Sequence, residues 1–251
     1  MAGETLYGIH AVIGSLKNAQ RHVSKVLVDE RRHDGAAQQI MALAEQRGIA
    51  LEPVNRTQLN RLLGHTRHQG VAALVEPLEY GSFRQVREQI EDLTGPQTLL
   101  VLDGVTDVGN FASLIRSAVA FGVDAIVIPR NRSVALTAAV AKRSSGALER
   151  VSVVRVVNIV DMLDELKRQG FWVYGAGTKA ELRVAQVQWP ERLAIVLGAE
   201  GSGMRRLVRE RCDALVRVPM RPGSNSLNVA VAGAIVLAYA WEQRCTVGSV
   251  P

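Results

Sequence analysis

Cysteine is scarce in this 251-residue chain, which contains only Cys212 and Cys245. Neither belongs to a C-x-x-C motif, and no cluster of cysteine and histidine has the spacing of zinc ligands. A disulfide framework needs several cysteines, and a structural zinc site needs four ligands at short spacings. The sequence therefore argues against both classes, and we expect a protein of the reducing cytoplasm.

Signals for membrane insertion and export are also missing. The first ten residues, MAGETLYGIH, contain no basic segment followed by an apolar core, so we expect no secretory signal. The longest apolar run, residues 227–241, is about 15 residues long and contains Asn228, whereas a membrane span needs about 20 residues. We interpret this run as a buried helix and expect no membrane partner.

Two common nucleotide-binding motifs are absent. The glycine-containing segment at residues 198–203 lacks the Lys-Ser/Thr pair of a P-loop, and it lacks the G-x-G-x-x-G spacing of a dinucleotide fingerprint. A nucleotide-dependent oxidoreductase would still be compatible with a general α/β pattern. Without the fingerprint, however, that class has little support.

The chain has a basic charge balance and the composition of a globular protein. Its net charge is +6 and its pI is about 9.7, while 47% of its residues are hydrophobic. A basic balance favours a polyanionic partner, although many basic proteins have none. The length suggests two domains rather than one.

The N-terminal part shows the pattern of a small α/β domain, which we place at residues 1–76. It contains all five histidines, and its first 75 residues have nine Lys/Arg against six Asp/Glu. The apolar runs predict strands, and the stretches between them predict helices at residues 11–18, 36–47 and 57–63. The next residues, 77–97, are acidic and contain proline and glycine, so we expect a linker with one exposed helix at 83–93.

Residues 98–251 show a second and longer α/β pattern. About six continuous apolar runs alternate with helical stretches, and they are LLVLD, AIVIP, VSVVRV, FWVYGAG, LAIVLG and ALVRVP. Continuous rather than alternating apolar runs are typical of strands that are covered on both faces of a parallel sheet. We therefore expect a C-terminal parallel-sheet domain. In such domains ligands usually bind where the strands end.

Three segments at strand ends contain candidate functional residues. In residues 102–118, Asn110 opens a helix that also contains Arg116, although an N-cap and a surface ion pair would explain both. In residues 193–204, Glu200 lies among Gly198, Gly201 and Gly203, whose flexibility would let a ligand approach the backbone, although a plain turn would look the same.

The third segment, residues 217–239, contains two polar side chains at the mouth of an apolar helix. Ser226 could be an N-cap, while Asn228 lies in the first turn among Val, Ala, Ile and Leu. A polar group in an apolar setting needs a partner. Capping and catalysis both remain open for this pair.

Taken together and in this order, the three segments resemble the three motifs of the SpoU (TrmH) family of SPOUT RNA 2'-O-methyltransferases. KRSSGALERV, residues 142–151, is similar to the stretch that this family has between its first two motifs. YGIHAV and HQGVAA, in the N-terminal domain, resemble the L30e-like RNA-binding domain of the ribosomal-RNA subgroup. In one departure, Val108 stands where the family usually has proline.

The resemblance implies a fold and an activity. The fold would be a C-terminal SPOUT domain with a deep trefoil knot, in a homodimer whose active site is completed across the two subunits. The activity would be S-adenosylmethionine-dependent 2'-O-methylation of a guanosine ribose in 23S ribosomal RNA. The implied cofactor-binding residues are Thr178, Leu197, Gly198, Gly201, Val218, Met220 and Leu227.

The resemblance also implies catalytic roles for Asn110, Arg116, Glu200, Ser226 and Asn228. A guanidinium normally stays protonated, so we expect Arg116 to fix the target phosphate and to lower the pKa of the ribose hydroxyl. The two asparagines would orient the ribose, Ser226 would hold its loop, and Glu200 would organise Arg116 or the glycine loop. Two alternatives remain, a transfer-RNA 2'-O-methyltransferase and a catalytically silent RNA-binding assembly factor.

Overall fold

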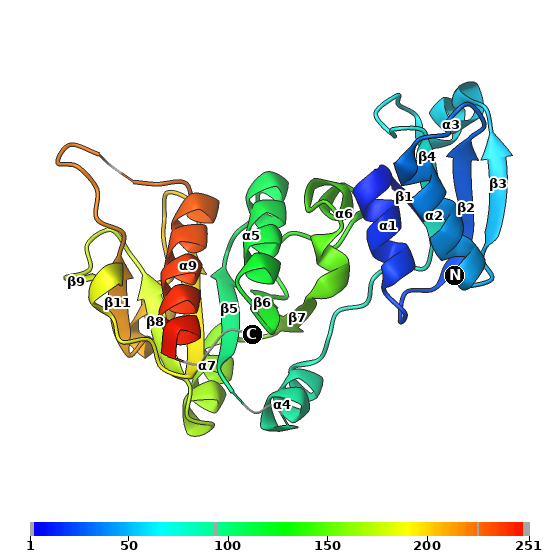
Figure 1. Cartoon of the computed structure of the whole chain (residues 1–251). Coiled ribbons are helices and arrows are strands. Elements are labelled where there is room, and N and C mark those ends of the chain that lie inside the picture. Colours follow the sequence, from blue (N-terminus) through cyan, green and yellow to red (C-terminus); the bar gives the residue numbers. More distant parts are fainter. Residues whose placement is uncertain (1–2, 93–94, 225, 248–251) are drawn as a thin grey trace. The chain divides into compact units, whose positions relative to one another are not determined.

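The structure is a computed structural model that describes residues 3–92, 95–224 and 226–247 (Figure 1). Its residue contacts divide the chain into two compact units. The small unit consists of the N-terminal part up to Glu79 together with Ala135–Arg150. The large unit consists of Tyr80–Val134 and the chain from Val151 onward.

The small unit contains a four-stranded sheet in the order β1-β4-β2-β3. The strands are β1 (Glu4–Tyr7), β2 (Val23–Asp29), β3 (Ala50–Val54) and β4 (Val71–Val75), and the helices between them are α1 (Ile9–Lys17), α2 (Gly35–Gln46) and α3 (Arg56–Leu63). β4 is antiparallel to both β1 and β2, and β2 is parallel to β3. All the strands and helices expected from the sequence in this part are present.

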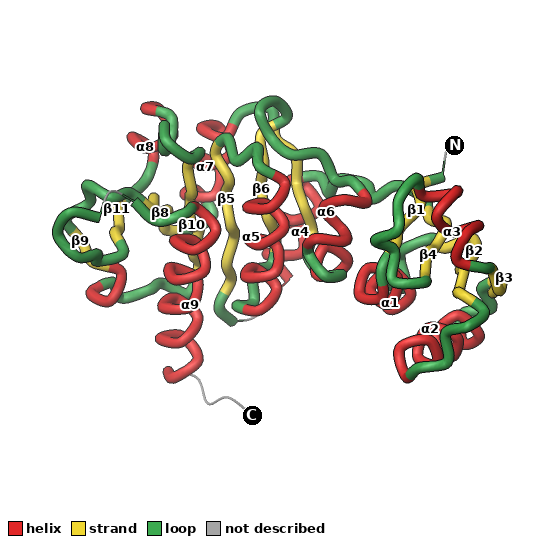
Figure 2. The backbone as a smooth tube through the Cα atoms, turned by 90° about the horizontal axis from the view of Figure 1, so that it is seen from above, coloured by secondary structure: helices red, strands yellow, loops and turns green. Residues whose placement is uncertain are grey.

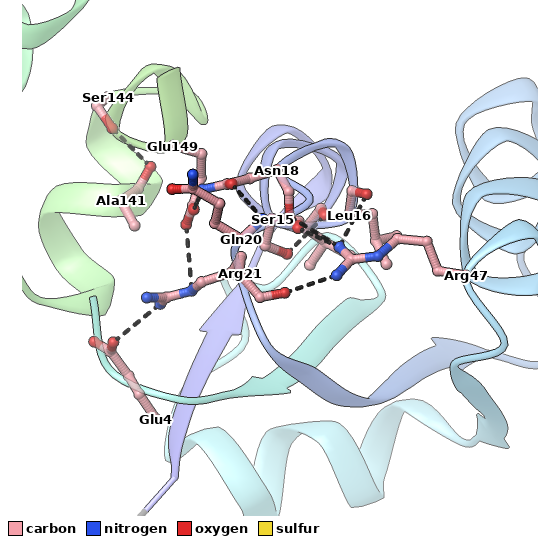
Figure 3. Close-up of polar contacts among 11 residues, drawn as sticks. Glu4, Ser15, Leu16, Asn18, Gln20, Arg21, Arg47, Ala141, Ser144 and Glu149 are labelled. Atoms are coloured by element: carbon pink, nitrogen blue, oxygen red, sulfur yellow. Dashed lines mark hydrogen bonds and ion pairs between the residues drawn. The ribbon is translucent and has the colours of Figure 1, made fainter. Parts of the chain in front are cut away.

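Local sequence explains where the helices of the small unit begin and end. Asp34 caps α2 by accepting a hydrogen bond from the N–H group of Ala37, and Asn55 forms a capping box with Gln58 at the start of α3. Arg47 donates hydrogen bonds to the carbonyl groups of Ser15, Leu16 and Asn18 at the C-terminal end of α1, and to that of Arg21 (Figure 3). The last carbonyls of a helix lack intrahelical partners, so a guanidinium at this place stabilises the end.

The segment 135–150 belongs to the small unit although it follows β6 of the large unit in the chain. It contains α6 (Ala138–Arg143) and a 3-10 helix, Ala147–Arg150. Gly146 has a φ of +78°, and a Cβ at this position would clash with the carbonyl oxygen of His10. Glu149 is buried, and its carboxylate accepts a hydrogen bond from Nδ2 of Asn18 (Figure 3). Nε of Arg21 lies 3.7 Å from Oε1 of Glu149. The division of the sequence into 1–76 and 98–251 did not anticipate this grouping.

The large unit is built on a seven-stranded sheet in the order β7-β6-β5-β10-β8-β11-β9, and every pair in it is parallel. Its strands are β5 (Gln97–Asp103), β6 (Ala125–Pro129), β7 (Ser152–Val156), β8 (Trp172–Ala176), β9 (Leu182–Arg183), β10 (Arg192–Gly198) and β11 (Ala214–Arg217). The expected parallel sheet is confirmed. The two-residue strand β9 was not expected, because two residues give no pattern.

Helices cover both faces of this sheet (Figure 2). They are α4 (Phe83–Asp92), α5 (Val108–Ala120), α7 (Ile159–Arg168), α8 (Arg206–Arg211) and α9 (Val229–Val247), with a 3-10 helix at Val184–Gln186. α4, α7 and α8 contribute to one apolar core with alternate strand residues such as Val101 and Val127. α5 and α9 lie on the opposite face. Continuous apolar strands follow from this double cover.

Helix α9 differs in one respect from the helix that the sequence predicted. We expected a buried helix, but Val231, Tyr239 and Trp241 are 48%, 41% and 41% exposed. The opposite face of α9 is closely packed: a Cβ atom added at Gly233 would lie only 2.6 Å from side-chain atoms of Leu114 and Leu197.

Within the described residues, no helix combines the length and apolar character needed to cross a membrane. The expected linker helix corresponds to α4, except for Leu93, which lies outside the described residues.

Candidate cofactor and catalytic site

A tight loop follows β10 at the carboxyl edge of the large sheet. Ala199 and Gly203 exchange two backbone hydrogen bonds, of 3.1 and 2.9 Å, which fold residues 199–203 back on themselves. Gly201 and Gly203 have φ values of +79° and +68°, which favour glycine. A Cβ at Gly198 would clash with the backbone of Gly203. The turn itself therefore requires these glycines, which is one of the two explanations that the sequence left open.

Asp103 fixes the end of this loop. Its carboxylate is fully buried at the end of β5, and it accepts hydrogen bonds of 2.7 Å from both the backbone N–H group and the Nε of Arg205. Gly198 is paired with Asp103 in the sheet register, so the two neighbouring strand ends hold opposite ends of the loop. Charge-assisted hydrogen bonds to a buried carboxylate are stronger than neutral ones.

A pocket of about 600 Å³ opens beside this loop. Its wall is formed by residues that follow β8, β10 and β11 and by the start of α9. All seven expected cofactor-binding residues line it, namely Thr178, Leu197, Gly198, Gly201, Val218, Met220 and Leu227. Its volume lies in the range of small-molecule sites, and apolar side chains and backbone groups form much of the wall.

Three polar side chains meet at one side of the pocket. Nδ2 of Asn228 donates hydrogen bonds to Oδ1 of Asn110 and to Oε1 of Glu200, both at 2.8 Å. Asn228 and Glu200 also line the pocket. Three segments that are far apart in the sequence are thus joined by one amide group.

Asn228 caps helix α9 with its remaining oxygen. Oδ1 of Asn228 accepts hydrogen bonds from the N–H groups of Ala230 and Val231 at 2.9 and 3.3 Å. The capping group is therefore Asn228 and not Ser226, because α9 begins at Val229. Ser226 lines the pocket, is exposed, and makes no hydrogen bond with a described residue.

Asn110 is likewise not the N-cap that its sequence position suggested. Helix α5 begins at Val108, and Asp107 caps it by accepting a 2.7 Å hydrogen bond from the N–H group of Asn110. The side chain of Asn110 is thereby left free to reach Asn228. Val108 occupies the first helical position, where proline is well tolerated because its missing N–H has no helical partner.

Arg116 lies outside the pocket wall. It is six residues after Asn110 on α5, which corresponds to about 9 Å along the helix and a different side of it. Its side chain is exposed and is not part of the pocket wall, and it makes no ion pair or hydrogen bond with a described residue. Glu200 accepts a hydrogen bond from Asn228 and not from Arg116, so of its two expected partners, Arg116 and the glycine loop, the first is not observed.

Sequence reasoning missed Asp103 and Arg205. One signal for Asp103 was present, because the run LLVLD ends a fully apolar strand with a carboxylate. A buried carboxylate needs a partner. No pattern in the sequence could have identified Arg205, since arginine is frequent in this stretch.

Comparisons with known proteins extend over both units. Residues 97–238 match the SpoU rRNA Methylase family, and residues 5–81 match the family described as RNA 2'-O ribose methyltransferase substrate binding. The chain is 38% identical over 250 residues, 100% of both chains, to a Staphylococcus aureus (strain MSSA476) protein named as belonging to the TrmH family of tRNA/rRNA methyltransferases. It is 39% identical over 242 residues, 96% of each chain, to the 23S rRNA (guanosine-2'-O-)-methyltransferase RlmB of Ralstonia nicotianae.

A solved structure shares the fold. The SpoU methyltransferase AviRb from Streptomyces viridochromogenes, crystallised in complex with the cofactor AdoMet, superposes with a TM-score of 0.79. The match covers 96% of this chain and 90% of that chain at 20% sequence identity. At this identity the likeness establishes the architecture.

Proposed function

Since the chain belongs to the SpoU rRNA Methylase family, we propose that it transfers a methyl group from S-adenosylmethionine to the 2'-hydroxyl of a guanosine ribose in 23S ribosomal RNA. The observation that carries this proposal is the pocket beside the glycine loop, whose side holds the joined side chains of Asn110, Asn228 and Glu200. A cofactor-sized pocket next to polar groups that can orient a hydroxyl is what methyl transfer requires.

The pocket suits the cofactor in size and chemistry. Backbone groups of the loop can bind polar edges, while Leu197, Met220 and Leu227 offer apolar contacts to a flat ring. S-adenosylmethionine supplies a methyl group on a positively charged sulfur. The residues that we propose to hold it are Thr178, Leu197, Gly198, Gly201, Val218, Met220 and Leu227.

Hydrogen bonds already made by the three polar side chains determine what they can offer to RNA. Asn110 uses Oδ1 and Glu200 uses Oε1 to accept from Asn228, which leaves Nδ2 of Asn110 as a donor and Oε2 of Glu200 as an acceptor. A ribose hydroxyl could donate to the carboxylate and accept from the amide. Such orientation of a reacting group supplies much of the rate enhancement in transfer reactions.

Arg116 would act on the RNA as a permanent cation. A guanidinium near the target lowers the pKa of the hydroxyl and binds the adjacent phosphate, and it does not serve as a base. Since Arg116 is exposed and outside the pocket of its own chain, we propose that it completes the pocket of a second subunit in a homodimer. The exposed apolar side chains of α9, including Val231 and Tyr239, support an interface there.

We also propose that the C-terminal segment forms the deep trefoil knot implied by the family. The sheet order supports this, because β10 lies between β5 and β8 although it follows both in the chain. A chain that threads through a loop is an exception to the usual rules of chain connection.

The N-terminal part supports ribosomal rather than transfer RNA as the substrate. We propose that residues 1–76 bind RNA, that 77–97 connect, and that 98–251 carry the methyl transfer. The match of residues 5–81 to a substrate-binding family supports this division. The same proposal places the protein in the cytoplasm, where ribosomal RNA is found. A transfer-RNA enzyme and a silent assembly factor are the alternatives.

One experiment separates these possibilities. The purified protein is incubated with methyl-labelled S-adenosylmethionine and with unmodified 23S rRNA, 16S rRNA or tRNA in separate reactions, and the labelled ribose is then mapped. We expect label on a guanosine of 23S rRNA only. Label only in tRNA would reject the ribosomal substrate, and no label in any pool, with the cofactor still bound, would favour the silent factor.

A further inference from the structure

The small unit contains a hollow of about 480 Å³ that the methyl-transfer site does not use. Its wall contains three cationic side chains and no acidic one, and the residues are Tyr7, Gly8, His10, Ala11, Arg56, Thr66, Arg67, Gln69, Lys142 and Ser145. Eight of the ten come from the N-terminal domain. Lys142 and Ser145 come from the segment 135–150, which the chain adds more than 60 residues later.

Lys142 is held in place within the hollow. Its Nζ lies 4.3 Å from the centroid of the Tyr7 ring, and it also donates a hydrogen bond to the backbone carbonyl of Arg67. The His65 ring contacts Tyr7 as well, with 4.5 Å between centroids. Cation–π contacts of this kind fix the direction of an ammonium group. Lys142 therefore presents a positioned charge.

The other two cations are exposed and have no counter-charge. The guanidinium groups of Arg56 and Arg67 make no hydrogen bond or ion pair with a described residue. Partial burial, followed by the nearby charge of Arg67, lowers the pKa of Lys142. Three positive groups that repel one another would be stabilised by a bound anion.

A second hollow continues the basic surface. It shares Arg56 and Gln69 with the first and adds Arg31 and Arg32, although it also contains Asp29 and Asp34. Asp34 forms an ion pair with Arg32, and neither Asp29 nor Asp34 lines the first hollow. A linear polyanion fits an extended basic surface better than a small free anion does.

We propose that Arg56, Arg67 and Lys142 form a binding site for the phosphodiester backbone of the substrate RNA, with the segment 135–150 supplying part of it. The site rests on the proposed function for its choice of RNA. On this proposal the segment 135–150, which connects two strands of the large sheet, takes part in RNA binding by the small unit.

Full-length protein and a fluorescein-labelled single-stranded fragment of 23S rRNA test the site by fluorescence anisotropy at several salt concentrations. We expect Arg67→Gln and Lys142→Gln each to weaken binding several-fold and to reduce the slope of log Kd against log salt by about 0.7, the value for one phosphate contact with a single strand. Lys142→Arg should restore the slope. The control is Lys17→Gln, which removes an exposed charge at the C-terminal end of α1 and should change neither quantity.

Two further measurements and one comparison of variants decide the outcome. The affinity for S-adenosylmethionine should be the same in every variant as in the wild type. If the wild type does not bind S-adenosylmethionine, the proposed function is contradicted rather than the RNA site. Because the Arg67 guanidinium makes no hydrogen bond or ion pair with a described residue, Arg67→Gln should fold normally, and an unchanged salt slope in this variant would overturn the site even if Lys142→Gln fails to fold. Weakened binding of inorganic phosphate with unchanged RNA affinity would show a free-anion site and would also overturn it.

Discussion

The side chains of Asn110 and Asn228, 118 residues apart in the chain, are joined by a hydrogen bond of 2.8 Å. Asn228 donates through Nδ2 and caps helix α9 through Oδ1, so one side chain both starts the helix and connects it to α5. The capping of α9 and the proposed orientation of the ribose therefore depend on the same side chain.

Two substitutions separate these roles. Asn228→Ala removes both, whereas Asn228→Asp keeps the capping oxygen but replaces the donor with an acceptor next to Glu200. We expect both variants to lose methyl transfer by about 100-fold, because small errors in alignment have effects of this size. Asn228→Ala should also lose about 1 kcal/mol of stability through loss of the cap, which Asn228→Asp retains. Single-turnover kinetics and thermal melting measure the two effects. Near-normal turnover of Asn228→Asp would contradict the role in orientation.

Arg116→Ala should abolish methyl transfer and leave the affinity for S-adenosylmethionine within a few-fold of the wild type, because Arg116 is outside the pocket wall. Isothermal titration calorimetry and transfer assays measure these quantities. Co-expression of Arg116→Ala with Asn228→Asp then tests the shared site. If each pocket uses the arginine of its partner, random pairing gives one intact pocket in half of the dimers, or about one quarter of wild-type activity. Activity no higher than that of either variant alone would place Arg116 elsewhere.

Asp103→Asn should weaken cofactor binding by loosening the loop at residues 199–205. The substitution places an N–H group against a donor of Arg205 in a buried position, which costs about 1–3 kcal/mol for an unsatisfied group. We expect a lower melting temperature and a higher Kd for S-adenosylmethionine. Glu210→Gln, which breaks an exposed ion pair with Arg206 on the adjacent helix, is the control. Equal cofactor affinity in the two variants would show that Asp103 does not position the loop.

Val108→Pro should stabilise the protein. Val108 is the first residue of α5, its N–H group makes no hydrogen bond with a described residue, and Asp107 already has the extended conformation that proline requires before it. Restricting the unfolded chain contributes about 0.4–1 kcal/mol, or about 1–4 °C in melting temperature for a chain of this size. Differential scanning calorimetry measures the shift. A lower melting temperature would show that the half-buried valine side chain matters more.

His68 should make stability depend on pH. It is fully buried, its Nδ1 accepts a hydrogen bond from the N–H group of Gly70, and burial lowers its pKa. Above the unfolded pKa of about 6.5 both states are neutral and the full stability is present. As the pH falls below this value, the unfolded state takes up a proton first, so stability decreases toward the lowered folded pKa.

Urea unfolding at several pH values tests this, with His68→Asn as the comparison. Burial raises the pKa of Glu149, which changes stability in the opposite direction, so the difference between the two proteins is the relevant quantity. We expect the wild type to lose more stability than His68→Asn between pH 7.5 and 5.5. Parallel curves would mean that His68 does not titrate differently in the two states.

Local patterns in the sequence predicted most of the elements. Apolar runs such as LLVLD and LAIVLG are long enough to identify strands, and their continuity identified the parallel sheet. The caps were harder to predict, because Asp107 and Asn110 are both good N-cap residues and only the structure decides between them. With Asp107 as the cap, the first turn of α5 begins at Val108.

The meeting of Asn110, Glu200 and Asn228 could not be derived from the sequence by physical reasoning. Each lies in a different segment, and only the sheet order brings the three strand ends together. The exposed side of α9 was missed because its sequence is apolar on all faces, which normally indicates complete burial.

The grouping of Ala135–Arg150 with the N-terminal part means that the chain passes between the two units three times, after residues 79, 134 and 150. The small unit therefore cannot be removed by cutting the chain at one place. Deleting its N-terminal residues would remove the groups that pack against Gly146, Leu148 and Glu149. The large unit would then carry an exposed segment with apolar and acidic side chains. A stable catalytic fragment would therefore need changes in Ala135–Arg150 as well as the deletion of the N-terminal residues.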